Sequence, residues 1–241
     1  MRHVKRASGS TILAVIVAVV GAVAAIVLFG NEPDVQDASD VRVPIDVEVR
    51  VTSAPGELDH DLGRVADRVR HLPLPGVNGL LVARSASATI QTNSGPASTC
   101  VVELDPADAR RFGPDLDATG FDGVDPPGAN GLVLNATVAA TVDVRAGGAV
   151  TAAIGTRRQR FAVEDVIAPD GLAGYCGALV PAGTVGAMAG DATDSRAPTG
   201  LVWIALDLEA RADTIAVDAV IAAIEAEVGA PGVEVSRYHG P

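Results

Sequence analysis

Alternating apolar and polar residues mark the first clear element of the chain. Valine or isoleucine occupies every second position from Val43 to Val51, which predicts a strand over 43–52 with one buried face. Apolar residues then recur at helical spacing and predict an amphipathic helix: Leu58, Leu62, Val65, Val69 and Leu72. A second strand is expected from Leu80 to Ile90, just after Pro75-Gly76-Val77. The order of elements is therefore strand, helix, strand.

The same order returns near the far end of the chain. A strand is expected over 201–208, and Asp213 or Thr214 can cap a helix that extends to Val228. Pro231-Gly232-Val233 then leads into a strand over 233–238. Two β-α-β units close naturally into one sheet, so we predict an α+β fold with a discontinuous ferredoxin-like (split βαβ) lobe formed by 43–90 and 201–238.

Residues 91–200 should form an inserted small mixed α/β lobe with its own core. Its expected elements are a polar loop over 92–99, a short strand over 100–104, a short helix that starts at Asp105-Pro106, a helix within 132–142, a hairpin of strands 149–154 and 159–167, and a strand over 178–181. Residues 183–195 are small and acidic, which predicts a surface loop.

An uncharged apolar run, Thr11 to Phe29, precedes all of these elements. A helix of this length spans a bilayer core of roughly 30 Å, so residues 11–30 are expected to be a single transmembrane helix. Arg2, Lys5 and Arg6 lie before it, which predicts a cytoplasmic tail over 1–10, an acidic stalk over 31–42 and an extracytoplasmic position for the rest. Cleavage as a signal peptide at Ala22-Val23-Ala24 is the alternative, and it leaves the remaining chain in the same compartment.

The charge balance excludes some partners. The chain has a formal net charge of −12, and three of its 18 basic residues precede the apolar run, which leaves 15 basic against 30 acidic residues after it. An acidic exposed part disfavours nucleic acid and anionic lipid surfaces as partners. High solubility is the simplest consequence of such a charge.

The chain has two cysteines, Cys100 and Cys176, both on the expected outer side of the membrane. An even number of cysteines in an oxidising compartment favours one disulfide that closes a long loop. Two free buried thiols are the alternative.

One segment imitates the start of a calcium-binding loop. Asp115, Asp117 and Gly120 follow the expected spacing, and Asp122 could add an oxygen ligand. Pro126 occupies the position where such a loop needs a bidentate glutamate. A solvated turn is therefore the alternative to a weak calcium site.

Other chemical motifs are missing from the sequence. The histidines are scattered without metal-ligand spacing, and there is no nucleophile elbow, P-loop or dinucleotide fingerprint. Asn135-Ala136-Thr137 fits a glycosylation acceptor but falls in an expected helix, and Trp203 is expected in the core or at its rim. We therefore predict no catalytic residues, no cofactor and no enzymatic activity.

The order of segments resembles a known family. The matching stretches are the strand 43–52, Leu74-Pro75-Gly76-Val77, Val102 to Ala107, Gly131 to Ala139, Val144 to Gly148 and Phe161 to Ile167. In this order they resemble the extracytoplasmic core domain of MacB/FtsX-type ABC transporter permeases, as found in actinobacterial members. The sequence departs from the family at Gly147-Gly148, where Gly-Asp is common.

The resemblance implies a function without catalysis. Such a domain has two lobes, one of them ferredoxin-like, and couples ATP hydrolysis by a cytoplasmic ABC ATPase subunit to export or to other processes of the cell envelope. The resemblance also implies further membrane helices as partners, in the permease itself beyond Pro241 or in another subunit. A single-pass envelope binding or scaffold protein with no transport role is the alternative, and homodimer formation stays open.

Overall fold

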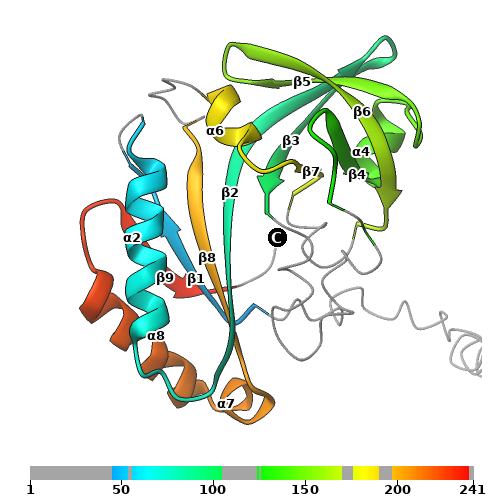
Figure 1. Cartoon of the computed structure of the whole chain (residues 1–241). Coiled ribbons are helices and arrows are strands. Elements are labelled where there is room, and N and C mark those ends of the chain that lie inside the picture. Colours follow the sequence, from blue (N-terminus) through cyan, green and yellow to red (C-terminus); the bar gives the residue numbers. More distant parts are fainter. Residues whose placement is uncertain are drawn as a thin grey trace, which may run out of the picture. The chain divides into compact units, whose positions relative to one another are not determined.

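The computed structural model describes residues 45–53, 56–104, 124, 126–169, 176–189 and 197–238 (Figure 1). The predicted tail, membrane helix and stalk lie outside these residues, as does the short helix expected at Asp105-Pro106. None of the helices in the described ranges has the length and apolar character that a membrane crossing requires. The described part is a mixed α/β structure.

The described strands join in one sheet of nine strands, in the order β3-β7-β4-β6-β5-β2-β8-β1-β9. A further pairing joins β3 to β2, so six of the strands close into a ring. Strand β2 (Val77–Thr92) is long enough to take part in both regions. Its first half pairs with β8 (Thr199–Leu206), and its second half pairs with β3 (Gly95–Glu103) and β5 (Ala149–Ile154).

The first region is an antiparallel sheet covered by helices. Strand β1 (Val47–Val51) lies between β8 and β9 (Val233–Arg237), and β8 also pairs with β2, which gives the local order β2-β8-β1-β9. Helices α2 (Leu58–His71) and α8 (Thr214–Val228) lie along the same face of this sheet (Figure 1). The alternate residues Val47, Val49 and Val51 point to these helices and are buried. The prediction that the first strand has one buried face is therefore confirmed.

Local sequence explains where α8 begins and where the strands β2 and β9 start. Asp213 caps α8, since its side chain accepts a hydrogen bond from the Ile215 backbone N–H at 2.8 Å, and the short helix α7 (Leu208–Ala212) is capped in the same way by Asp207. The repeated Pro-Gly-Val places Gly76 and Gly232 at φ values of 73° and 83°. Only glycine adopts this left-handed backbone without strain, so the motif turns the chain from helix to strand.

The second region is a closed ring of β3, β7 (Ala178–Val180), β4 (Gly131–Asn135), β6 (Arg157–Ile167), β5 and the second half of β2. The β3–β7 and β4–β6 pairs are parallel, and the remaining pairs are antiparallel. Its interior is filled by apolar side chains such as Ile90, Leu132 and Phe161. We call this region the barrel, and we call the first region the helix-covered sheet.

A separate apolar core joins the two regions. Val102, Val133 and Leu179 on the outer side of the barrel belong to the same cluster as Leu201 and Trp203 of β8. Neighbouring residues in these strands point into the barrel instead, for example Val101 and Leu132. Strands β4 and β7 and the last residues of β3 therefore have both faces buried.

Three expectations for the inserted lobe need correction. The expected loop over 92–99 is a tight hairpin, because β2 continues to Thr92, turns at Asn93-Ser94 and returns as β3 from Gly95. Its polar composition reflects the solvent-exposed outer face of the barrel.

The other two corrections concern helices. The helix expected within 132–142 is confirmed as α4 (Ala136–Thr141), but Asn135, which was expected in it, ends the strand over 131–135. This strand was missed because a short apolar run buried on both faces has no period of its own. The surface loop expected from residue 183 contains the helix α6 (Thr184–Ala189). Val185 and Met188 of this helix are buried in the barrel core. The other residues of the helix are small, so the helix fits into a narrow space.

Candidate functional site

Two open pockets lie next to each other on the outer face of the barrel. The first, here called the arginine pocket, has a volume of about 640 Å³ and is lined by residues of the β2–β3 turn, of the segment after α4, and of β5 and β6, including Asn93, Asp143, Arg158 and Arg160. The second, the hydroxyl pocket, has a volume of about 840 Å³ and is lined mainly by small hydroxyl side chains of β2 and β3. Gln91 and Arg158 line both pockets.

Strand register explains why these side chains meet. Arg160 on β6 is opposite Thr151 on β5, which is opposite Gln91 on β2. One step further along, Arg158 is opposite Ala153, which is opposite Thr89 and then Ser98 on β3. Residues that are directly opposite have Cβ atoms roughly 5 Å apart, so each row forms a continuous polar strip across the strands.

The residues between these positions point the other way. Phe161, Ala152 and Ile90 alternate with the polar rows and are buried in the barrel core. The pockets are therefore solvent-facing and lie on a rigid, closed sheet, which holds the spacing of the two rows at roughly 7 Å.

The arginines of the pockets have no charged partner. Neither Arg158 nor Arg160 makes an ion pair or hydrogen bond with any residue that the structure describes. Eight other arginines in the described ranges do contact a carboxylate or a backbone carbonyl oxygen: Arg50, Arg64, Arg68, Arg70, Arg84, Arg157, Arg211 and Arg237. The pocket arginines are thus available to an external anion.

Asp143 is the acidic residue of the arginine pocket. It has a φ of 51°, and its Oδ2 accepts a hydrogen bond of 3.4 Å from the Ser94 hydroxyl. Thr92 fixes the same turn, because its hydroxyl donates to the Val142 carbonyl oxygen at 2.5 Å and accepts from the Ser94 N–H at 3.1 Å. The remaining lining residues are uncharged, so the two arginines dominate the charge of the pockets.

Buried carboxylates elsewhere serve the structure. Glu48 accepts a 2.8 Å hydrogen bond from the Trp203 indole N–H and another from Arg50. Asp46 pairs with Arg211 at 2.9 Å and accepts from the Leu206 N–H. Burial raises the pKa of the Asp46 carboxyl above its usual range, although Leu206 and Arg211 lower it.

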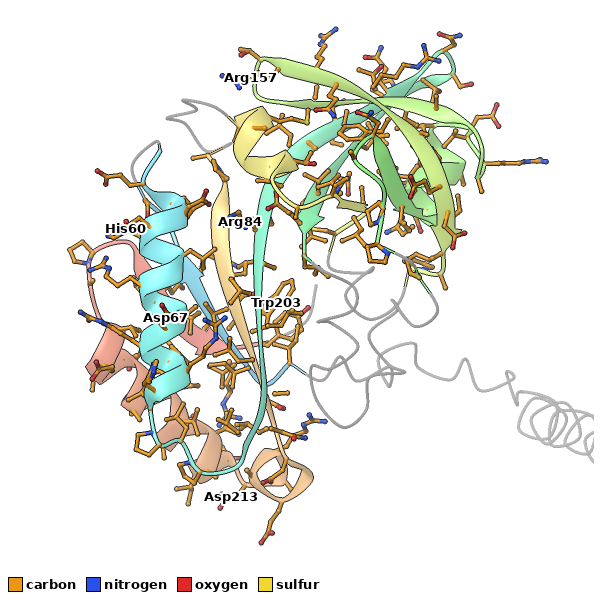
Figure 2. All side chains as sticks on the ribbon, viewed as in Figure 1. His60, Asp67, Arg84, Arg157, Trp203 and Asp213 are labelled. Atoms are coloured by element: carbon orange, nitrogen blue, oxygen red, sulfur yellow. A yellow bond between two sulfur atoms is a disulfide. The ribbon has the colours of Figure 1, made fainter. Side chains whose placement is uncertain are left out.

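A third network joins the helix-covered sheet to the barrel. Arg84, on β2, donates to Asp59 of α2 at 2.7 Å and to Glu103 of β3 at 3.0 Å (Figure 2). The buried Glu103 carboxylate also accepts from the Val185 N–H of α6 at 2.8 Å. These contacts fix α2, β3 and α6 to β2.

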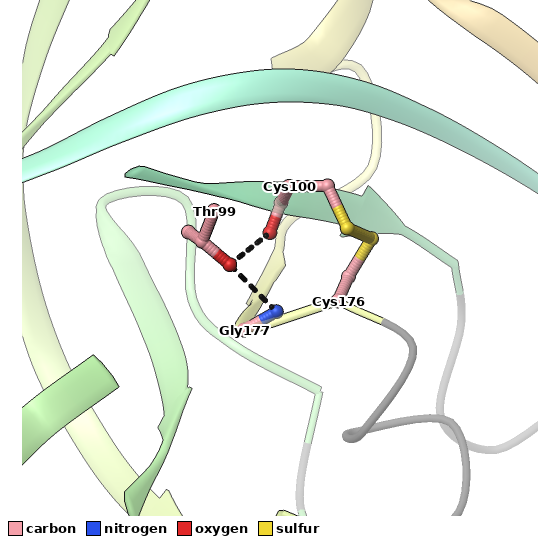
Figure 3. The surroundings of a disulfide bond; sticks show 4 residues. All are labelled: Thr99, Cys100, Cys176 and Gly177. Carbon is pink, nitrogen blue, oxygen red and sulfur yellow. Dashed lines mark hydrogen bonds between the residues drawn. A yellow bond between two sulfur atoms is a disulfide. The ribbon is translucent and has the colours of Figure 1, made fainter. Parts of the chain in front are cut away.

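Cys100 of β3 and Cys176, just before β7, form a disulfide with an S–S distance of 2.01 Å (Figure 3). The Gly177 N–H donates to the Thr99 hydroxyl oxygen at 3.1 Å beside the bond. The disulfide thus links two segments that pair as parallel strands, 76 residues apart in sequence.

The other residues singled out from the sequence do not form a site. Asp115, Asp117 and Asp122 lie outside the described residues, and no cluster of His, Cys, Asp or Glu suited to a metal ion occurs within the described ranges. His60 and His71 are exposed on α2. Trp203 is fully buried, and the buried Asn135 side chain caps α4 by accepting from the Val138 N–H.

Sequence reasoning missed the two pockets. The signals that could have indicated them are the run Arg157-Arg158-Gln159-Arg160 in an acidic chain and the Ser/Thr-rich stretch 85–99. Arg158 and Arg160 are two residues apart, which places them on one face of a strand. Which strands lie beside them could not be read from the run itself.

Two solved structures illustrate what this chain is similar to. One is a domain described as part of a permease protein from Porphyromonas gingivalis, with 10% sequence identity, a TM-score of 0.39, and coverage of 84% of this chain and 94% of that one. The other is the extracellular domain of the noncanonic ABC-type transporter YknZ from Gram-positive bacteria, with 11% identity, a TM-score of 0.42, and coverage of 79% of this chain and 100% of that one. No family model and no curated protein matches the chain.

Proposed function

We propose that this chain is the membrane-anchored extracytoplasmic domain of an ABC transporter permease-like protein. In this role it couples ATP hydrolysis by a cytoplasmic partner subunit to export or to other processes of the cell envelope. Residues 43–90 and 201–238 would form its ferredoxin-like lobe, and residues 91–200 the inserted lobe. The proposal gives the chain no enzymatic role and no cofactor.

The observation that carries the proposal is the pairing of the two distant β-α-β units. Strand β1 lies between β8 and β9, so the second unit encloses a strand of the first, and the local order β2-β8-β1-β9 is antiparallel throughout. This order supports the proposed split βαβ sheet, and the chain between the two units leaves it to form the barrel. The arrangement supports the two-lobed architecture that the sequence resemblance implies.

The expected compartment has independent support. A disulfide between Cys100 and Cys176 is typical of an oxidising environment, and the apolar run from Thr11 to Phe29 with basic residues before it is typical of an anchor with a cytoplasmic N-terminus. Both features favour an extracytoplasmic position for the residues after the run.

Copurification tests the partnership. The full chain carries a C-terminal affinity tag and is purified from membranes of its native host in a mild detergent, and associated proteins are identified by mass spectrometry. We expect a cytoplasmic ABC ATPase subunit and further membrane helices to copurify. In a matched control, residues 11–29 are replaced by an unrelated apolar helix of the same length, which should reduce the ATPase recovered.

The control chain must keep its disulfide, as measured by labelling with a membrane-impermeant maleimide before and after reduction. Repeated purification of the intact native chain without any ATPase would contradict the proposal. Maleimide labelling of Cys100 and Cys176 only after the membrane is permeabilised would contradict the expected orientation.

A second candidate function is a single-pass binding or scaffold protein of the cell envelope. The observation that favours it is the pair of solvent-facing pockets with two arginines that have no ion-pair partner among the described residues, because such a surface can bind a ligand without any transport step. An envelope ligand recovered in the same purification without an ATPase would support this function instead of the first.

A further inference from the structure

We propose that the arginine pocket and the hydroxyl pocket form one binding site for an extended polyanion, namely a sugar or polyol chain that carries phosphate or carboxylate groups. The inference concerns the barrel surface alone and does not depend on a partnership with an ATPase. It assigns a ligand class to a region that has no assigned function in the proposed transport role.

The charge of the pockets is the first observation that supports the proposal. After the apolar run the chain has twice as many acidic as basic residues, yet the pockets combine two arginines with a single acid, Asp143. Arg158 and Arg160 make no ion pair with a described residue, in contrast to arginines such as Arg84 and Arg237. Guanidinium groups bind phosphate and carboxylate through two parallel N–H bonds, so an anion is the partner that this surface lacks.

The spacing of the two arginines is the second observation. Arg158 and Arg160 lie in neighbouring polar rows on one face of β6, so their Cα atoms are roughly 7 Å apart. The two pockets continue from these rows across β5 and β2 to β3, and they share Gln91 and Arg158. An extended ligand with repeated acidic groups can therefore contact both arginines while it continues over the adjoining pocket.

The chemistry of the other side chains that line the pockets is the third observation. Ser87, Thr89 and Ser98 present short hydroxyl groups in the hydroxyl pocket, and hydroxyls can both donate to and accept from the hydroxyls of a sugar or polyol. Among the described residues that line the two pockets none is aromatic, so there is no stacking platform for a nucleobase.

An acidic peptide fits the same surface less well. Two common modes of peptide binding need a free strand edge or an apolar groove, and the pockets offer neither, because they lie on the face of a closed ring of strands whose apolar side chains point inward. The observations therefore favour a hydrophilic polymer with acidic groups over a peptide or a membrane surface.

The experiment measures binding by the full chain in nanodiscs of zwitterionic lipid. Polygalacturonate is the carboxylate-bearing sugar polymer, inorganic polyphosphate is the phosphate-bearing polymer without hydroxyls, and dextran is the neutral polymer. We expect polygalacturonate to bind at low salt, polyphosphate to bind more weakly because it lacks hydroxyls, and dextran not to bind. Affinity should fall as salt concentration rises, because binding releases counterions.

Two double variants assign the site. Arg158→Gln with Arg160→Gln should lower affinity for polygalacturonate by at least about tenfold at low salt, since each arginine contributes charge-assisted hydrogen bonds. Arg64→Gln with Arg70→Gln is the matched control, because it removes the same charge from exposed surface pairs on α2 and should leave affinity within about twofold. Far-UV circular dichroism checks that both variants are folded.

Three outcomes would overturn the inference. They are the absence of binding by either polyanion, an equal loss of affinity in the two double variants, and tighter binding of poly-L-glutamate than of polygalacturonate. The last outcome would assign the pockets to acidic peptides instead. Binding that requires anionic vesicles in place of a soluble polymer would likewise assign them to a membrane surface.

Discussion

Gly147 and Gly232 have the same backbone conformation but different surroundings. Both have a φ of 83°, a value that favours glycine. A Cβ at Gly147 would meet no atom within 4 Å, whereas a Cβ at Gly232 would meet the backbone oxygen of Thr52. The pair separates the cost of the backbone conformation from the cost of a steric clash.

We expect Gly147→Ala to lower the free energy of unfolding by about 1 kcal/mol through backbone strain alone. Gly232→Ala should cost at least about 2 kcal/mol more, because Thr52 donates to the Gly232 carbonyl oxygen at 2.7 Å and its backbone cannot move away without breaking this bond. Urea unfolding of the two variants measures the difference. Equal costs would show that the contact with Thr52 is absent in solution.

Asp46 and Asp61 should give opposite pH dependence of stability. Burial raises the pKa of Asp46 above 3.8 in the folded state, so its contribution to stability is complete below pH 3.8 and is lost as pH rises through the folded pKa. A hydrogen bond from the Ser53 hydroxyl lowers the pKa of Asp61, so its contribution is present above pH 3.8 and is lost as pH falls through the folded pKa.

Substitution by asparagine tests both signs. As pH rises above 3.8, the native chain should lose stability relative to Asp46→Asn, while as pH falls below 3.8 it should lose stability relative to Asp61→Asn. Unfolding by urea at a series of pH values, followed by circular dichroism, measures both differences. A parallel pH profile for the native chain and Asp46→Asn would contradict the assignment for Asp46.

At the scale of elements, Arg84 makes two ion pairs of similar length in different environments. Its partner Asp59 has a side chain that is 71% exposed, while Glu103 is 2% exposed. Exposed pairs contribute little because water screens them, whereas the loss of one partner in a buried pair leaves an uncompensated charge. Glu103 also holds the first turn of α6 through the Val185 N–H.

Glu103→Gln should therefore destabilise the fold by about 3 kcal/mol, and Asp59→Asn by less than about 1 kcal/mol. Both substitutions remove one negative charge next to the same arginine, so each serves as the control for the other. Thermal unfolding measures the two effects. A larger effect at Asp59 would mean that Glu103 is not buried against Arg84 in solution.

The success of sequence analysis differed between elements for a physical reason. The α2 and α8 helices and β1 each have one buried face, so their periods could be read directly, and Asp213 was identified as a possible cap. Strand β4 is buried on both faces and has no alternation, so it was missed, and only the helix α4 was predicted within 132–142. The hairpin at Asn93-Ser94 was missed because its outward residues are as polar as those of a loop.

At the scale of the whole described part, β2 is the shared structural element. It pairs with β8 of the helix-covered sheet and with β3 and β5 of the barrel, and a common apolar core contains Val133 of the barrel and Trp203 of the sheet. Neither region can lose its pairing with β2 without exposing part of this core. We therefore expect the two regions to unfold together.

Fluorescence of Trp203, the single tryptophan, reports on the apolar core that joins the two regions, while far-UV circular dichroism reports on the secondary structure of both. The midpoints of urea unfolding measured by the two signals should coincide within error. Reduction of the disulfide should shift both midpoints together to lower urea concentration, because the bond constrains the unfolded chain. Two separate transitions would contradict the shared core.

The sequence by itself determined the local elements that have one buried face, the candidate anchor, the two β-α-β units and their glycine turns, because each depends on residues close together in the chain. The closed barrel, the course of β2 through both regions and the meeting of Arg158, Thr89 and Ser98 were decided only by tertiary structure. These features depend on which strands lie side by side. Strand pairing over a long sequence separation is set by the burial of both faces of β4, of β7 and of the last residues of β3, and a pattern local to one strand does not identify its partner.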